Sequence, residues 1–112
     1  MLEPILGSTN SERVLIFLTT REEGYAREIA RFFETSLTPI QKQLEKLEFG
    51  GVLVSRPVGR TRLYSLNPRY PFLDELKALL NKALTFYPEE LREDLILNRR
   101  RPRRADKPLT QE

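Results

Sequence analysis

The segment from residue 36 to residue 66 constrains the fold more than any other part of the chain. It opens with an amphipathic helix, whose apolar face recurs at helical spacing: Leu37, Ile40, Leu44 and Leu47. The opposite face is entirely polar: Thr38, Gln41, Lys42, Glu45 and Lys46. Gly50 and Gly51 then end the helix, because glycine commonly follows the last helical residue.

Two residues are able to cap the start of this helix. With Ser36 as the N-cap, Leu37, Thr38 and Pro39 form the first turn, where proline costs little. With Thr38 as the N-cap, Pro39 takes the first helical position and Gln41 completes a capping box. Ser36 is favoured, because Leu37 then joins the buried face.

A basic β-hairpin follows the helix. Residues 52–56 and 61–66 are rich in β-forming side chains, and the segment 57–60, with Pro57 and Gly59, separates them. The hairpin has no acidic residue, and its basic residues are Arg56, Arg60 and Arg62.

Two further helices are expected before residue 36. Residues 11–20 are strongly apolar, and Thr9 and Glu12 have the spacing of a capping box. The polar segment 21–24 ends on glycine and is expected to be a connection. A second helix is expected from Tyr25, and it carries one narrow apolar stripe: Ala26, Ile29, Ala30 and Phe33.

A long apolar helix is expected after the hairpin, from Pro71 to Tyr87, where Pro88 interrupts it. It has more apolar residues than a one-sided surface helix needs, so we expect it to serve both the core and a dimer interface. The residues expected at this interface are Leu73, Leu76, Leu80, Leu84 and Tyr87. Residues 89–98 are expected to add another helical turn or two.

Cysteine and histidine are absent from all 112 residues. Their absence excludes disulfides, thiolate nucleophiles and thiolate metal sites, together with the usual general base at neutral pH. We therefore expect no enzyme activity, no metal site and no cofactor. No apolar run approaches the ~20 residues that span a bilayer, and no signal peptide is recognisable, so we expect a cytoplasmic protein without membrane contact.

The formal charge of +3 is unevenly distributed. Residues 99–112 carry six basic and two acidic side chains, whereas the rest of the chain carries 13 basic and 14 acidic ones. The segment 99–112 is therefore expected to be a flexible basic tail. It either adds sequence-independent attraction to phosphates or serves solubility alone.

Three helices followed by an arginine-tipped hairpin is the order of a winged helix-turn-helix. The predicted fold class is mainly α with a small β-hairpin (α+β), a winged helix-turn-helix with a C-terminal dimerisation helix. Residues 1–70 are expected to form the DNA-binding domain, residues 71–98 the helical dimerisation segment and residues 99–112 the tail.

Several short motifs also resemble a known group of proteins. They are Glu28-Ile29-Ala30, the spacing of Ser36, Ile40, Leu44 and Leu47, and Gly51-Val52-Leu53. Over roughly residues 10–85 the chain resembles bacterial winged-helix regulators of the ArsR-like and MarR-like groups. The hairpin segment 59–68 particularly resembles small ArsR-like proteins, including ones beside or fused to minimal nucleotidyltransferase domains. The resemblance implies dimers that bind DNA, and the missing cysteine and histidine clusters argue against metal sensing.

The expected function is that of a sequence-specific regulator of transcription, a repressor that binds double-stranded DNA as a homodimer. Helix 36–49 would enter the major groove and hairpin 52–66 would act as the wing. The expected DNA contacts are Ser36, Thr38, Pro39, Gln41, Lys42, Lys46, Arg56, Arg60 and Arg62. The alternative is a winged-helix protein-interaction module that partners a nucleotidyltransferase or a toxin-type protein. RNA binding is less favoured, because no aromatic residues interleave with the arginines of the tail.

Overall fold

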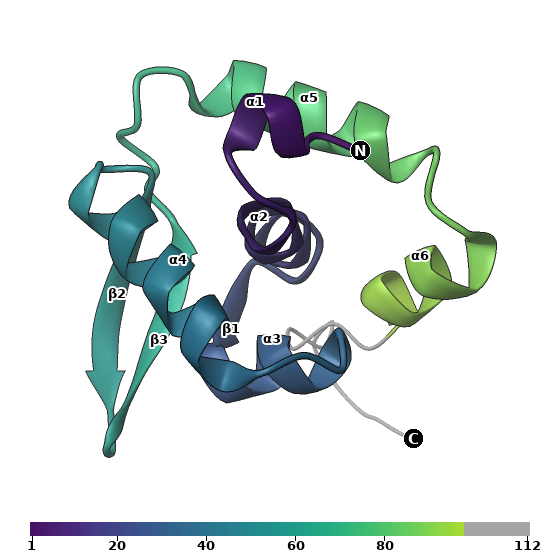
Figure 1. The fold of residues 1–112 in the computed structure, drawn as a ribbon. Coiled ribbons are helices and arrows are strands. Elements are labelled where there is room, and N and C mark those ends of the chain that lie inside the picture. Colours follow the sequence, from purple (N-terminus) through teal and green to yellow (C-terminus); the bar gives the residue numbers. More distant parts are fainter. Residues whose placement is uncertain (98–112) are drawn as a thin grey trace, which may run out of the picture.

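Helix α2 (Thr9–Arg21) lies at the centre of the structure, a computed structural model that describes residues 1–97 (Figure 1). Around it are arranged α1 (Glu3–Leu6), β1 (Glu23–Tyr25), α3 (Ala26–Phe32), α4 (Leu37–Phe49), β2 (Leu53–Val58), β3 (Thr61–Leu66), α5 (Leu73–Leu84) and α6 (Glu89–Leu97). The mainly helical α+β class predicted from the sequence is confirmed. The predicted basic tail, 99–112, lies outside the described residues.

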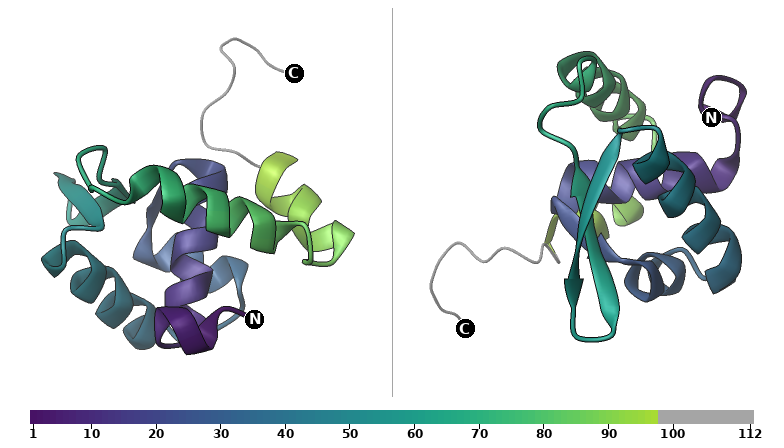
Figure 2. Two further views of the ribbon diagram at one scale, coloured as in Figure 1. Left: turned by 90° about the horizontal axis from the view of Figure 1, so that it is seen from above. Right: turned by 90° about the vertical axis from the view of Figure 1, so that its left-hand side faces the viewer.

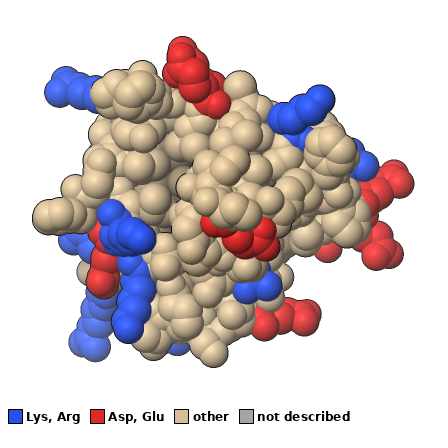
Figure 3. Space-filling model, turned by 45° about the horizontal axis from the view of Figure 1, so that its top comes forward, with Lys and Arg blue, Asp and Glu red and all other residues tan. Residues whose placement is uncertain are grey.

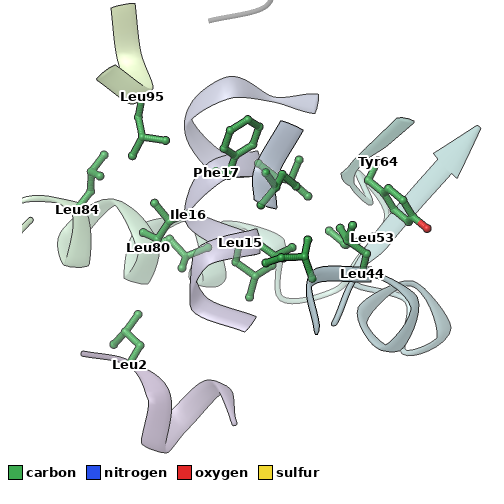
Figure 4. Packing of buried hydrophobic residues seen from close by; sticks show 14 of the residues in the cluster. Leu2, Leu15, Ile16, Phe17, Leu44, Leu53, Tyr64, Leu80, Leu84 and Leu95 are labelled. Atoms are coloured by element: carbon green, nitrogen blue, oxygen red, sulfur yellow. The ribbon is translucent and has the colours of Figure 1, made fainter. Parts of the chain in front are cut away.

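The core is built on α2. All side chains from Val14 to Leu18 are at most 2% exposed, whereas a surface helix buries only one stripe. Helices α4, α5 and α6 pack against α2 from different sides, and Figure 4 shows Leu44, Leu80 and Leu95 of these helices around it. Figure 2 shows α5 crossing α2. One continuous core therefore joins the first helices of the chain to the last.

The N-terminus of α2 differs from the prediction. Ser8, rather than Thr9, caps the helix, and its hydroxyl oxygen accepts a hydrogen bond from a first-turn backbone N–H at 3.0 Å. The predicted capping box of Thr9 and Glu12 is wrong, because the Glu12 carboxylate is buried and bonded elsewhere. It accepts hydrogen bonds from the backbone N–H of Leu2 at 2.7 Å and from the Tyr87 hydroxyl. Burial, together with this carboxylate, raises the pKa of the Tyr87 hydroxyl.

The segment 21–24, predicted to be a plain connection, contributes the short strand β1. The sheet has the order β1-β3-β2, and Gly24 lies opposite Tyr64. A Cβ atom added at Gly24 would lie 2.7 Å from Cε1 of Phe17, which is fully buried in α2. Glycine therefore lets the sheet approach the central helix directly.

Helices α3 and α4 follow the predicted pattern. The stripe on α3 buries Ile29 and Ala30, and α4 buries Ile40 and Leu44. Ser36 is the N-cap of α4, with an extended backbone at φ −67° and ψ 149°, so the preferred start of this helix is confirmed, but the Ser36 side chain makes no capping hydrogen bond.

The hairpin has a tighter turn than predicted. Pro57 and Val58 belong to β2, so only Gly59 and Arg60 connect the strands, with Gly59 at φ 61°. Pro57 was predicted to lie in the connection between the strands, because proline is rare inside strands. Here β2 is an edge strand, where a missing N–H is tolerated.

The last two helices contain the residues of the expected dimer interface. Helix α5 begins at Leu73 rather than Pro71, and its Leu80 and Leu84 lie in the chain's own core, with Leu80 fully buried. Within the chain these two leucines therefore have core partners, and a role for them at a dimer interface stays a prediction. Leu73 and Leu76 are half-buried, and the Tyr87 hydroxyl is bonded within the chain. Among residues 1–97, no helix combines the length and the apolar character needed to cross a membrane.

Replacing Gly24 with alanine should destabilise the fold, because the new methyl group would collide with the Phe17 ring in a packed core. We expect a loss of about 1–3 kcal/mol in the free energy of unfolding, measured by urea denaturation. Gly50→Ala is the matched control, because Gly50 has φ −81° and the nearest atom to an added Cβ is 3.5 Å away. Equal stability of the Gly24→Ala variant and the wild type would contradict this account of β1.

Candidate nucleic-acid interface

A groove of about 710 Å³ lies between the paired helices α3 and α4 and the hairpin of β2 and β3. Each of these elements contributes to its lining. The lining residues are Tyr25 at the end of β1, Ala26, Arg27, Glu28 and Arg31 on α3, Gln41 and Glu45 on α4, and Arg60, Thr61, Arg62 and Tyr64 on the hairpin. The groove therefore joins the polar face of α4 to the basic tip of the hairpin.

Helix α4 presents its polar face to solvent, as predicted. Its exposed residues include Thr38, Gln41, Lys42 and Lys46, while Pro39 is half-buried in the first turn. Ser36, the N-cap, is also exposed. The hairpin tip projects beyond the first turns of α4 (Figures 1 and 2). A polymer lying against α4 would thus meet the hairpin as well.

The three hairpin arginines do not lie together. Arg60 and Arg62 line the groove, but Arg56 does not. Side chains alternate between the two faces of a strand, and Arg56 pairs in register with Leu63, the neighbour of Arg62. Arg56 therefore lies on the other face, where its Nη2 is 3.7 Å from Oε1 of Glu23.

Two arginines of α3 were missed by the sequence analysis. Arg27 and Arg31 are both exposed and both line the groove. Their spacing of four residues places them on one face of the helix, opposite the apolar stripe. This spacing was a usable signal, but only the apolar stripe of this helix was considered in the sequence.

The groove is basic in spite of two acidic residues in its lining. Glu28 is already engaged within the chain: its Oε1 accepts a hydrogen bond from the Tyr25 backbone N–H at 3.2 Å, and its Oε2 lies 3.7 Å from Nη1 of Arg21. Four arginines then face the remaining carboxylate, Glu45. Figure 3 shows blue side chains gathered at the lower left, on the side where Figure 1 places α4 and the hairpin.

Tyr64 adds a neutral donor at the base of the groove. Burial raises the pKa of its hydroxyl, and the carboxylates of Glu48 and Glu45 raise it further. The hydroxyl therefore stays protonated at neutral pH and is able to donate a hydrogen bond to an anionic oxygen.

The chemistry of the groove suits anionic oxygens. Guanidinium groups bind phosphate oxygens through parallel hydrogen bonds, and hydroxyl and amide groups add neutral ones. Within residues 1–97, no cluster of three or more acidic side chains is placed to hold a metal ion.

Comparisons with known proteins support the fold. No family model and no curated protein matches the sequence. A mutant of MarR from E. coli superposes with a TM-score of 0.59 and 16% identity, covering 87% of this chain and 69% of MarR. A mutant of ZitR from Lactococcus lactis in its apo form gives 0.53 and 20%, covering 78% of this chain and 74% of ZitR.

A third solved structure, the adhesin competence repressor AdcR from Streptococcus pyogenes, gives a TM-score of 0.51 and 14% identity, covering 84% of this chain and 78% of AdcR. At these identities the similarity establishes the fold alone. The fold is a winged helix similar to those of these three structures, with α3 and α4 as the helix-turn-helix and β2 and β3 as the wing.

Proposed function

We propose that this chain is a regulator of transcription that binds double-stranded DNA with α4 and the wing. The observation that carries the proposal is the basic groove shared by α4, α3 and the hairpin. The major groove of B-DNA admits one α-helix, and the sugar-phosphate strand beside it would then run between α4 and the wing. Arg31, Arg60 and Arg62 are available to that strand on its path.

Base recognition is assigned to the polar face of α4. Gln41 suits the paired acceptor and donor of adenine, and Lys42 suits the acceptors of guanine or a phosphate. Ser36 and Thr38, at the start of α4, suit phosphate oxygens. Because these groups are exposed on a helix anchored by Ile40 and Leu44, their spacing is fixed before DNA arrives.

We propose repression as the direction of regulation. AdcR, which shares the fold, is named a repressor, and a protein that covers its operator blocks transcription without further partners. The subgroup, ArsR-like or MarR-like, stays a prediction.

The direct test is fluorescence anisotropy with a labelled fragment from upstream of the gene, titrated with protein at several salt concentrations. A scrambled fragment is the competitor. Preference for the upstream fragment near physiological salt is the expected result. Equal and steeply salt-dependent binding to both would contradict sequence-specific regulation and favour the protein-interaction module.

Replacing Lys42 and Arg60 together with alanine should weaken binding of the upstream fragment by about 10- to 100-fold, because one contact of the exposed α4 face and one contact of the hairpin in the groove are lost. Both side chains are exposed, so the melting temperature should not change. The charge-matched control is Arg69→Ala with Lys77→Ala, two exposed residues outside the groove. Equal losses in both double variants would refute this assignment of the binding face.

We further propose that the protein is a homodimer, with an interface that differs from the one expected from the sequence. A groove of about 390 Å³ between the start of the chain and α5 is lined by Met1, Leu2, Leu79, Lys82, Ala83 and Phe86. Phe86 is 67% exposed, and Ile5 of α1 is 69% exposed. An apolar groove with exposed apolar side chains beside it suits an association surface, whereas a single exposed ring does not mark one.

A second copy is the proposed occupant. A two-fold interface needs one face that carries both a pocket and a group to fill it. The groove beside α5 and the exposed Phe86 ring at its rim meet this requirement within one chain. A dimer through this face would leave α4 and the wing of both copies free.

Phe86→Glu should dissociate this dimer without unfolding the chain, because a charge would replace an exposed ring of the interface. Sedimentation equilibrium should give twice the 13.2 kDa chain mass for the wild type and the single mass for the variant. Phe49→Glu, at a ring that is 96% exposed at the end of α4, is the control and should remain dimeric. A monomeric wild type would exclude the dimer, and a dimeric Phe86→Glu variant would exclude this interface.

A further inference from the structure

A chain of hydrogen bonds crosses from the recognition helix to the wing. The Arg62 Nε–H of β3 donates to the Ser55 Oγ of β2 at 2.8 Å. The Ser55 hydroxyl in turn donates to Oε2 of Glu48 on α4 at 2.7 Å. A serine hydroxyl has one hydrogen and two lone pairs, so the carboxylate takes the hydrogen and leaves a lone pair for the guanidinium.

The register of the hairpin explains why these residues meet. Ser55 lies opposite Tyr64, and Arg62 precedes Tyr64 by two positions, so all three share one face. Diagonal pairs of this kind lie within reach of a long side chain. On the opposite face, Arg56 is directed to Glu23 instead.

The bond to Ser55 uses only the Nε–H of Arg62. Among the ion pairs within residues 1–97, none involves Arg62, so its two terminal nitrogens remain available in the groove that Arg62 lines. An unanchored arginine on an exposed hairpin samples many rotamers, and binding a phosphate costs the conformational entropy of fixing one of them. The hydrogen bond at Nε already fixes part of the side chain, so less entropy is lost when a phosphate binds.

We infer that Ser55 is a positioning residue, which holds Arg62 of the wing in place for a DNA phosphate and ties the wing to the recognition helix through Glu48. This inference rests on the proposed DNA-binding function. Ser55 itself touches no DNA in this account: it acts through Arg62. We call the hydrogen-bonded chain of Glu48, Ser55 and Arg62 the Ser55 tether. It sets the distance between α4 and Arg62, so that α4 reaches the major groove and Arg62 reaches a phosphate of the same duplex at the same time.

The first test does not need DNA. The Nε–H resonance of Arg62 in the free protein should exchange slowly with water, because it is hydrogen-bonded, and Ser55→Ala should accelerate that exchange at least several-fold. Ser55→Thr keeps the hydroxyl and suits a strand, so it should restore slow exchange. Fast exchange of the Arg62 Nε–H in the wild type would overturn the inference.

The second test measures affinity for the upstream fragment. Ser55→Ala should weaken binding by about three- to ten-fold, with a modest fall in melting temperature, because the hydroxyl also makes two hydrogen bonds within the fold. Arg62→Ala should weaken binding more and lower the salt slope by about one. In the Arg62→Ala background, adding Ser55→Ala should cost much less than it costs in the wild type, because the arginine that Ser55 positions is gone.

The two tests separate the possible failures. A full additional loss from Ser55→Ala in the Arg62→Ala background would overturn the positioning role, although DNA binding itself would stand. A wild type that binds no duplex would refute the proposed function and, with it, the DNA role of the tether. The exchange measurement would in that case still report whether Ser55 holds Arg62.

Discussion

The burial of α2 on all sides is the constraint on which the rest of the structure depends. Its run from Val14 to Leu18 has no exposed stripe, so the chain must cover it with α4 on one side and with α5 and α6 on others. The buried face of α4 therefore rests on the same helix that supports α5 and α6. Any shift of α4 relative to α2 would open the core around Leu44, at a cost of several kcal/mol by analogy with large core deletions.

The C-terminal end of α2 extends this constraint. The Arg21 guanidinium lies 4.7 Å from the ring centre of Phe17 and 4.9 Å from that of Phe32 on α3. It also donates hydrogen bonds to the backbone carbonyls of Asp94 and Leu95 on α6, at 3.1 and 3.3 Å. One cation thus binds two carbonyls in the last turns of α6 and joins that helix to α3, as basic side chains near a helix C-terminus commonly do.

The groove between α4 and the wing follows from this scaffold. The sheet can approach α2 because Gly24 has no side chain, and this approach brings Arg62 and Tyr64 to the same groove as Gln41 and Glu45. The position of the wing is therefore fixed by packing at its base and by the Ser55 tether further out. A rigid frame of this kind lets a few exposed side chains keep the spacing that a duplex requires.

Local patterns were predictable from the sequence, and long-range pairings were not. The start of α4 at Ser36 and its buried face depend on neighbouring residues, so they were predicted correctly. Glu12 was assigned to a capping box because its true partner, Tyr87, lies 75 positions away. Strand β1 was missed because its three residues show no alternation and become a strand only against β3.

In the candidate site, too, local features were predictable from the sequence and long-range ones were not. The polar face of α4 was evident from helical spacing, whereas the opposite orientations of Arg56 and Arg62 depend on the strand register. Leu80 was placed at an interface because a helix that is apolar nearly all round suits a core and a dimer seam equally well. Only the position of α5 against α2 shows that Leu80 lies in the core.

Amide chemical-shift mapping with a short upstream duplex decides whether α4 and the wing form one DNA-binding surface. We expect the largest shifts at residues 36–46 and 59–62, with exposed residues of α5 such as Lys77 unchanged. Shifts confined to α5 and α6, or no shifts at saturating duplex, would contradict this DNA-binding surface.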